Sequence, residues 1–187
     1  MVPIGAAVTD GYNAGHGLPF DSDGMKERYP GVFFSQFTGA ELVAEKWNLS
    51  REDLDEFALE SHHKAANATE SKYFDREILP VEGKNAEGIN ELVLADEGIR
   101  FDASFDKLAG LKPVTDGGVI TAGNASQITD GAAAVMICND AGLKKIQSNP
   151  RAEIVSISVV GDDPVFMLTG PIPASKKALE AAGLSID

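Results

Sequence analysis

The spacing of apolar positions predicts two helices in the first third of the chain. Val43 and Trp47 lie four residues apart, which places them on one face of a helix that Thr38 is positioned to cap. Ser50 and Asp53 form an S-x-x-D pattern, which is typical of the start of another helix. In this second helix, apolar or small residues recur at steps of three and four and form one stripe: Leu54, Phe57, Ala58, Ser61, Ala65 and Ala68.

Four acidic residues, Glu52, Asp53, Asp55 and Glu56, occupy the first turns of the second helix. The positive end of the helix dipole stabilises carboxylates at such positions. We therefore expect all four side chains to be solvated.

The residues that precede these helices, 1–37, are rich in glycine and proline and are expected to be irregular. Within them, Met25–Tyr29 offers at most one helical turn before Pro30. His16 lies between two glycines, so we expect it on an exposed loop.

Strand-like and helix-like segments alternate along the rest of the chain. Glu77–Val93 is β-prone, and Ala132–Cys138 lacks polar alternation, as expected for a strand covered on both faces. Ile154–Val160 reads as a second buried strand. Helices are expected at Ser104–Leu108, Asn139–Gln147 and Ser175–Ala182. The last helix is followed by residues 183–187, as where an α/β unit turns toward its next strand, and the first residues offer no strand to pair with 132–138. We therefore expect a slice of a larger α/β protein.

Charge and composition exclude several classes of function. The 187 residues contain 16 basic and 29 acidic side chains, a net charge of −13, which disfavours binding to nucleic acid or to anionic membranes. No apolar run approaches the ~20 residues that cross a bilayer. The first residues lack the basic region of a secretory signal. We expect a soluble, cytoplasmic protein with no membrane and no nucleic-acid partner.

The cysteine and two of the histidines are expected to have no catalytic or metal-binding role. Cys138 is the only cysteine, so an internal disulfide and an all-cysteine metal site are excluded. Its apolar neighbours predict a buried, unreactive thiol. His62 and His63 are adjacent on a helix and point about 100° apart, so they do not share a metal and are assigned to the solvated face.

Two segments remain open between structural and ligand-binding roles. Residues 121–126, TAGNAS, combine small side chains with the polar groups of Asn124 and Ser126, which suits either a close ligand or a tight turn. Met167 begins a stretch between a strand and a helix, where α/β sheets commonly bind ligands, although methionine more often fills a core.

Several of these segments together resemble the thiolase family. TAGNASQITDGAAAVM at 121–136 resembles the family signature T-A-G-N-A-S-G-x-x-D-G-A-A-A. LSREDLDEFALESHHKAA at 49–66 and GDDPVFMLTGPIPASKKALEAAGL at 161–184 are similar to two further family stretches. DREILPV at 75–81 and LAGLKP at 108–113 fit in the same order.

The resemblance implies a fold of class α/β, with a loop domain and parts of the two α/β halves of a thiolase. Residues 1–126 would form the loop domain that cradles coenzyme A. Residues 127–147 would end the N-terminal half, and 148–187 would begin the C-terminal half.

The resemblance also implies an acyltransferase that interchanges acyl-CoA plus acetyl-CoA with 3-ketoacyl-CoA plus free CoA. It implies no metal, no cofactor beyond coenzyme A as substrate, and a parent that is a homodimer or homotetramer. The family's nucleophilic C-G-S-G-type cysteine and its N-E-A-F, G-H-P-x-G and C-x-G-x-G motifs do not occur in these residues. We therefore expect no catalytic residue and no activity in this chain alone.

Positions that match the family's ligand contacts are expected to bind coenzyme A. Ser126 and Ala122 match small residues beside the pantetheine, and Ile128 matches an apolar neighbour of the ligand. Arg100 and Lys107 match positions at the nucleotide end, where Lys107 replaces a serine. Two further residues complete the set: Met167, near the acyl pocket, and Gln36, within a Ser-Gln-Phe that replaces the family's His-Met-Gly.

Other departures from the family pattern suggest a reshaped acyl pocket. Phe37 and Leu168 are bulkier than the glycines that they replace, and Gln127 replaces the glycine that follows Ser126. An alternative function is a natural, non-catalytic CoA-binding module, or a subunit completed by a second chain. Cooperative unfolding of the pure chain would favour this alternative.

Overall fold

A computed structural model describes residues 4–18, 20–85, 87–129, 131–147, 149 and 152–186. The chain forms two compact units. One comprises Met1–Val43 together with Ile154–Asp187, and the other comprises Ala44–Glu153.

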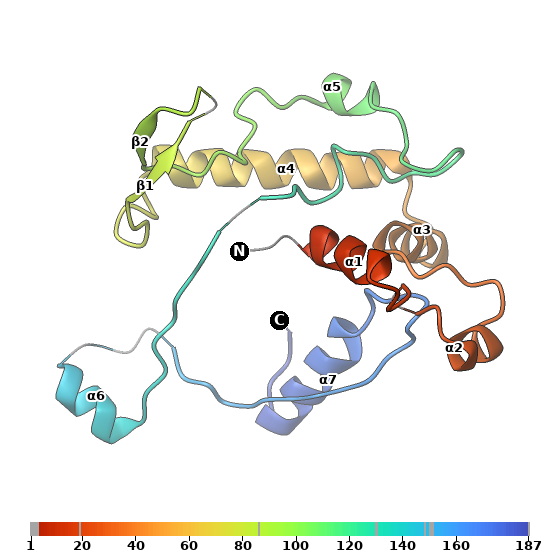
Figure 1. The fold of residues 1–187 in the computed structure, drawn as a ribbon. Helices are drawn as coiled ribbons and strands as arrows, with labels where there is room; N and C mark the ends of the chain where they lie inside the picture. The colour runs from red at the N-terminus through yellow and green to blue at the C-terminus, as the bar shows by residue number, and fades with distance from the viewer. Residues whose placement is uncertain are drawn as a thin grey trace. The chain divides into compact units, whose positions relative to one another are not determined.

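The first unit contains one helix that the sequence did not predict and a second that extends the helical turn predicted at Met25–Tyr29. They are α1, Ile4–Asn13, and α2, Asp23–Arg28 (Figure 1). The expectation that 1–37 is irregular is therefore wrong. An isolated glycine such as Gly11 costs helix stability but does not end a helix. The hydroxyl of Ser22 accepts a hydrogen bond from the backbone N–H of Met25 and so caps α2. The helix therefore begins two residues before the predicted turn.

Helix α3, Gln36–Lys46, begins two residues before the predicted cap Thr38. At its start the Ser35 hydroxyl accepts a hydrogen bond from the N–H of Phe37 at 3.2 Å. Gly39 is buried and lies against the turn at Phe166, where an added Cβ would be 2.5 Å from the Phe166 carbonyl oxygen. Glycine at this position lets α3 approach that turn closely.

Helix α7, Pro171–Ala182, contains the predicted helix and starts four residues earlier. The segment 154–160 is extended and lies along it: Ser156 and Ser158 each donate a hydroxyl hydrogen bond at 2.7 Å to a carbonyl oxygen of α7 (Figure 1). The described residues give this segment no partner strand, and Val159 is 81% exposed. The expected buried strand is therefore not formed.

The second unit is organised along α4, Arg51–Glu70, which begins as predicted. The N–H of Asp53 donates to the Ser50 hydroxyl at 3.1 Å, and the N–H of Ser50 donates to the Asp53 carboxylate at 2.7 Å, completing a capping box. Hydrogen bonds from Ser50 lower the pKa of the Asp53 carboxyl group. Phe57, in the apolar stripe of this helix, is 75% exposed.

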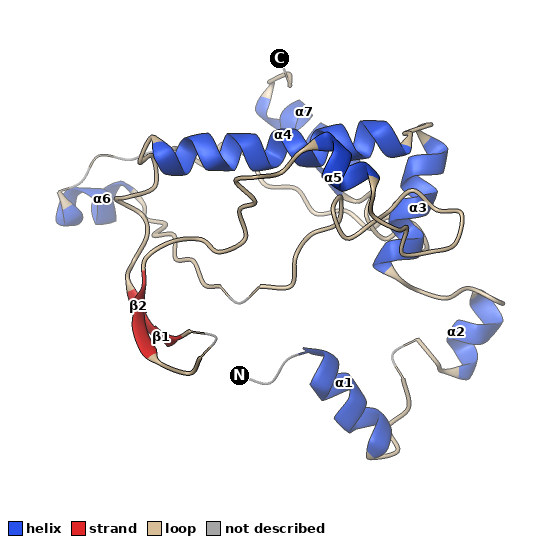
Figure 2. Cartoon of the chain, turned by 90° about the horizontal axis from the view of Figure 1, so that it is seen from above, coloured by secondary structure: helices blue, strands red, loops and turns tan. Residues whose placement is uncertain are grey.

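The β-prone segment forms a hairpin of β1, Val81–Lys84, and β2, Asn90–Val93, drawn in red in Figure 2. The two strands are antiparallel, with Val81 opposite Val93. The side chain of Asn85 shapes the turn by accepting a hydrogen bond from the N–H of Ile89 at 3.0 Å. A two-stranded sheet therefore forms within the predicted Glu77–Val93 region.

Two short helices of this unit confirm their sequence predictions. Helix α5, Phe105–Ala109, is capped by the side chain of Ser104, and α6, Asp140–Ile146, is capped by that of Asn139. Each cap satisfies a backbone N–H that the helix leaves without an internal partner.

The predicted buried strand Ala132–Cys138 is not formed in the structure. Its residues are extended and exposed, with Val135 at 85% and Ile137 at 74% exposure. Cys138 is likewise exposed, which corrects the expectation of a buried thiol. A strand needs a neighbour to satisfy its backbone groups, and no neighbouring strand occurs in the part of the chain that is described.

Candidate functional site

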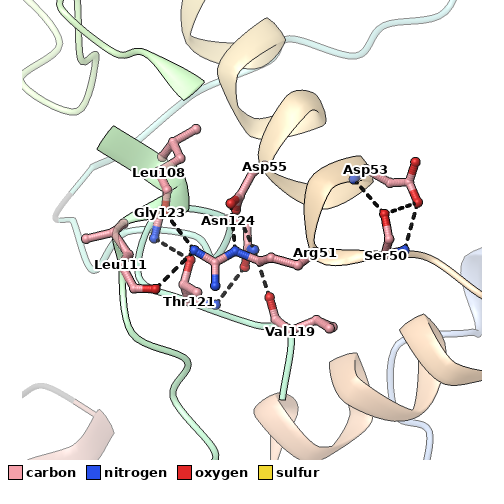
Figure 3. Close-up of polar contacts among 10 residues, drawn as sticks. All are labelled: Ser50, Arg51, Asp53, Asp55, Leu108, Leu111, Val119, Thr121, Gly123 and Asn124. Atoms are coloured by element: carbon pink, nitrogen blue, oxygen red, sulfur yellow. Dashed lines mark hydrogen bonds and ion pairs between the residues drawn. The ribbon is translucent and has the colours of Figure 1, made fainter. Parts of the chain in front are cut away.

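The second unit is tied together by a buried carboxylate, that of Asp55, which is 1% exposed. The Nε of Arg51 donates to Asp55 Oδ2 at 2.6 Å, and the Asn124 amide donates to Asp55 Oδ1 at 3.0 Å (Figure 3). The expectation that Asp55 is solvated is therefore wrong. The paired guanidinium and the amide compensate the cost of removing its charge from water.

The guanidinium of Arg51 also contacts the end of α5. Its Nη2 donates to the carbonyl oxygen of Leu108 at 2.6 Å and to that of Leu111 at 3.1 Å (Figure 3). One side chain of α4 thus satisfies backbone acceptors of α5 and of the residues that follow it.

Asn124 shapes the loop that carries the TAGNAS sequence. Its amide nitrogen donates to the carbonyl of Val119 at 3.0 Å, and its oxygen accepts a hydrogen bond from the N–H of Thr121 at 2.8 Å (Figure 3). Thr121 is fully buried, and its hydroxyl accepts a hydrogen bond from the N–H of Gly123 at 3.1 Å. For Asn124 the tight-turn interpretation therefore holds.

Gly123 allows this loop to lie against α5. An added Cβ would be 2.6 Å from Leu108 Cδ2 and 2.6 Å from Leu111 Cδ1. The loop backbone and these two leucines are consequently in close contact.

A pocket of about 270 Å³ lies beside this contact, entirely within the second unit. Its lining combines two cations with apolar and small side chains. The lining residues are His62, Arg100, Asp102, Ala103, Ser104, Lys107, Leu108, Leu111, Ala122, Gly123, Ala125 and Gln127.

Polar contacts order the cationic side of the pocket. The Lys107 ammonium donates to the carbonyl oxygen of Asp102 at 2.8 Å and to the Asp102 carboxylate. The hydrogen bond from Lys107, with its charge, lowers the pKa of Asp102. The backbone N–H of Arg100 donates to His62 Nδ1 at 3.2 Å. His62 is therefore half-buried, which corrects its assignment to the solvated face.

The pocket brings together three of the residues expected to bind a ligand: Arg100, Lys107 and Ala122. Ser126 is exposed and stands between two lining residues, and Ile128 is fully exposed.

The remaining two expected ligand-binding residues, Gln36 and Met167, belong to the first unit. Gln36 is the exposed first residue of α3. Met167 is 36% exposed and adopts a positive φ of 60°, and its Cβ would lie 3.6 Å from a Cβ added at Gly39 of α3.

Sequence reasoning missed the contributions of Arg51, Asp55 and Gln127. The spacing of Arg51 and Asp55, four residues apart on a helix, was the available signal of an ion pair. Gln127 stands where the family signature has a glycine. Its side-chain amide donates to the carbonyl oxygen of Gly98, and its side chain lines the pocket.

Two further features concern metals and membranes. Within the described ranges, no group of three or more histidine, cysteine, aspartate or glutamate side chains is arranged to hold a metal ion. None of the helices among the described residues has the length and apolar character needed to span a bilayer.

Comparison with known proteins identifies the relatives of this fold. Residues 20–141 match the family described as thiolase, N-terminal domain. The chain is 44% identical over 188 residues to a steroid 3-ketoacyl-CoA thiolase of Mycobacterium tuberculosis, covering 100% of this chain and 45% of that protein. It is 43% identical over 190 residues to an acetyl-CoA acetyltransferase of Rhizobium meliloti, covering 100% and 48%.

Solved structures agree with these sequence relationships. The acetyl-CoA acetyltransferase of Bacillus anthracis superposes with a TM-score of 0.77 at 39% identity, covering 84% of this chain and 40% of that one. Human mitochondrial 3-ketoacyl-CoA thiolase gives a TM-score of 0.73 at 40% identity, covering 79% and 38%.

These matches define the fold as part of an α/β thiolase fold, as the sequence predicted. The chain belongs to the thiolase family. It spans about half the length of the curated relatives that it matches.

Proposed function

We propose that this chain is the central part of a thiolase-type acyltransferase and supplies binding elements for coenzyme A. The whole enzyme interchanges acyl-CoA plus acetyl-CoA with 3-ketoacyl-CoA plus free CoA. The pocket of the second unit carries this proposal, because Arg100, Lys107 and Ala122 line it together. The names of the relatives, a 3-ketoacyl-CoA thiolase and an acetyl-CoA acetyltransferase, support the same substrate class.

The chemistry of the pocket suits a ligand with a phosphorylated end and an extended arm. Arg100 offers a planar set of donors to a phosphate, and Lys107 offers a second cation. Leu108, Leu111 and Ala122 provide an apolar surface for the methylene groups of pantetheine. Since Asp102 already accepts hydrogen bonds from Lys107, a bound phosphate competes with that carboxylate for the ammonium.

The other expected residues extend this binding role along the chain. Ser126 and Ile128 follow the pocket-lining loop in the sequence, and we assign Ser126 to the pantetheine arm and Ile128 to an apolar contact with the ligand. In the first unit, Gly39 lets α3, which begins with Gln36, approach the turn that carries Met167. We assign Met167 to the region near the acyl group and Gln36 to the region beside the pantetheine.

The proposed domain organisation follows the family pattern. Residues 1–126 form the loop domain, 127–147 end the N-terminal half and 148–187 begin the C-terminal half. The parent is a cytoplasmic homodimer or homotetramer.

The chain supplies no covalent chemistry of its own in this proposal. The family's nucleophilic cysteine motif does not occur in its sequence, and acyl transfer through an acyl-enzyme requires such a nucleophile. Cys138 is not a substitute, because it lies in the exposed extended segment and outside the pocket.

Calorimetric titration of the 187-residue chain tests the binding role. Coenzyme A is expected to bind, and Arg100→Ala is expected to weaken it about tenfold, the effect of losing a charge-assisted hydrogen bond. Pantetheine, which lacks the nucleotide, is expected to bind equally to both chains. Absence of CoA binding at millimolar concentration would overturn the proposal.

Two further measurements separate the fragment from the alternative of a self-standing module. The pure chain is expected not to cleave acetoacetyl-CoA in the presence of CoA, and measurable cleavage would contradict its inactivity. The intact mass of the polypeptide in its native cells should be about twice 19.7 kDa. A native mass of 19.7 kDa would favour a CoA-binding module or a subunit completed by a second chain.

A further inference from the structure

We infer that the ion pair of Arg51 with the buried Asp55 positions both walls of the pocket lined by Arg100 and Lys107. Neither residue of the pair lines the pocket, so both are positioning residues. The identity of the ligand rests on the proposed function, whereas the positioning of the walls stands on the contacts of the pair alone.

The first wall is formed by the end of α5 and by Leu111, two residues after the helix. Leu108 and Leu111 line the pocket, and both of their carbonyl oxygens accept hydrogen bonds from Arg51 Nη2. A guanidinium can span two carbonyls and a carboxylate at once because its N–H donors point in several fixed directions.

The second wall is the loop that contains Ala122, Gly123 and Ala125. Asn124 connects this loop to the pair, since its amide donates to Asp55 Oδ1 while its oxygen accepts from the N–H of Thr121. The Asp55 carboxylate thus joins the two walls: Oδ2 accepts from Arg51 and Oδ1 accepts from Asn124 (Figure 3).

The two walls meet at Gly123, where the loop backbone lies against Leu108 and Leu111. A shift of either wall therefore changes the opening of the pocket. Because Asp55 is 1% exposed, water does not replace a lost partner without rearrangement of the site. Removing one member of a buried pair leaves the other uncompensated, so the walls are expected to separate.

Three variants distinguish the connections of the ion pair to the two walls. Asp55→Asn removes the charge and leaves one acceptor oxygen for two donors, so one bond to Arg51 or Asn124 is lost, the other is weakened, and both walls are expected to loosen. Asn124→Ala removes the loop's connection to Asp55 together with the loop's own bonds to Val119 and Thr121, and Arg51→Lys removes the fork that reaches the carbonyls of Leu108 and Leu111. Glu60→Gln is the matched control, because the Glu60 carboxylate pairs with exposed Lys64 on the same helix and lies outside the pocket.

Amide hydrogen exchange of the 187-residue chain reports the walls separately. With Asp55→Asn, amides of 119–125 and of 105–111 are expected to exchange about tenfold faster, which corresponds to the loss of one charged hydrogen bond. Asn124→Ala is expected to affect 119–125 alone and Arg51→Lys 105–111 alone. The α4 amides and the control variant are expected to stay unchanged.

Two exchange results would overturn the inference. One is faster exchange throughout α4 and the β1–β2 hairpin in Asp55→Asn, which marks general destabilisation instead of positioning. The other is unchanged exchange in both walls. If Asp55→Asn does not fold, Arg51→Lys, which keeps the positive charge, decides the wall formed by Leu108 and Leu111 by the same measurement.

Titration with coenzyme A then links the walls to the ligand. Asp55→Asn is expected to weaken CoA binding about tenfold relative to the Glu60→Gln control. Failure of the unmodified chain to bind CoA would refute the proposed function while the exchange results still decide the positioning role. Normal CoA affinity in Asp55→Asn would refute the link between the pair and the ligand.

Discussion

The side-chain amide of Gln127 donates a hydrogen bond to the backbone carbonyl oxygen of Gly98, 29 residues earlier in the chain. This contact joins the segment after Ser126 to the turn that precedes Arg100. Gln127 and Arg100 both line the pocket. A glycine, which stands at this position in the family signature, has no side chain to make the contact.

We predict that Gln127→Gly releases the turn before Arg100. Amides of residues 96–100 are expected to exchange several-fold faster, and CoA is expected to bind several-fold more weakly, because one hydrogen bond contributes about 1 kcal/mol. Gln147→Gly provides the matched control, since Gln147 ends α6 outside the pocket and its φ of 49° suits glycine. Unchanged exchange at 96–100 would refute the contact.

Two glycines in helices are predicted to respond to alanine in opposite directions. Gly39→Ala places Cβ 2.5 Å from the carbonyl oxygen of Phe166, so it should destabilise the chain by about 1–3 kcal/mol. Gly11→Ala in α1 meets no atom within 4 Å and should stabilise by about 0.5–1 kcal/mol. Urea unfolding followed by circular dichroism measures both, and equal effects would contradict the packing of α3 on the Phe166 turn.

The Asp102 carboxyl is predicted to titrate higher when its cation is removed. Lys107 holds the pKa of Asp102 below its ordinary value, so Lys107→Gln should raise that pKa toward the ordinary value. Carboxyl chemical shifts in an NMR titration measure the change. Lys64→Gln is the control, because Lys64 pairs with Glu60 and lowers the pKa of that residue instead.

The same pair predicts a pH dependence of stability with a defined sign. A depressed pKa in the folded state means that the pair stabilises the chain above about pH 4, the unfolded value for aspartate, and that this contribution is lost as the pH falls through the folded value. Lys107→Gln should therefore lose less stability on acidification below about pH 4 than the unmodified chain. An identical pH profile would show that Lys107 does not stabilise the Asp102 carboxylate.

Cys138 is predicted to react as an accessible thiol. Its exposure in the extended segment before α6 predicts that a disulfide reagent labels it in the native chain nearly as fast as in denaturant. Slow native labelling with fast labelling in denaturant would instead support the buried strand that the sequence pattern indicates. Because Cys138 is the only cysteine, the measurement needs no second variant.

Local signals in the sequence predicted those elements whose stability comes from nearby residues. The capping box of Ser50 and Asp53 marks the start of α4, and Ser104 and Asn139 cap their helices as expected. In each case the cap satisfies an N–H within the next few residues, so the information is contained in a short stretch. Helices α1 and α2 form within 1–37 although they contain Gly11 and Gly24, because an isolated glycine lowers helix stability without ending a helix.

Predictions that depended on distant partners were less reliable. The apolar run before Cys138 has the composition of a buried strand, but strands require neighbours, and the described part of the chain pairs only β1 with β2. The prediction for Asp55 was wrong in the opposite sense, because a side chain expected in solvent is buried. Its position near a helix start suggested solvent, but Arg51 and Asn124 bury it.

The sequence by itself determined the family, through motifs spread from residue 49 to 184. It also supplied the residues that we propose as ligand contacts. The tertiary structure decided which of those residues come together: Arg100, Lys107 and Ala122 line one pocket, while Met167 and Gln36 belong to the other unit. It also decided that Asp55 and Asn124, 69 residues apart, hold that pocket's walls. Motifs record local chemistry, whereas a buried carboxylate is stable only where folding brings its donors to it.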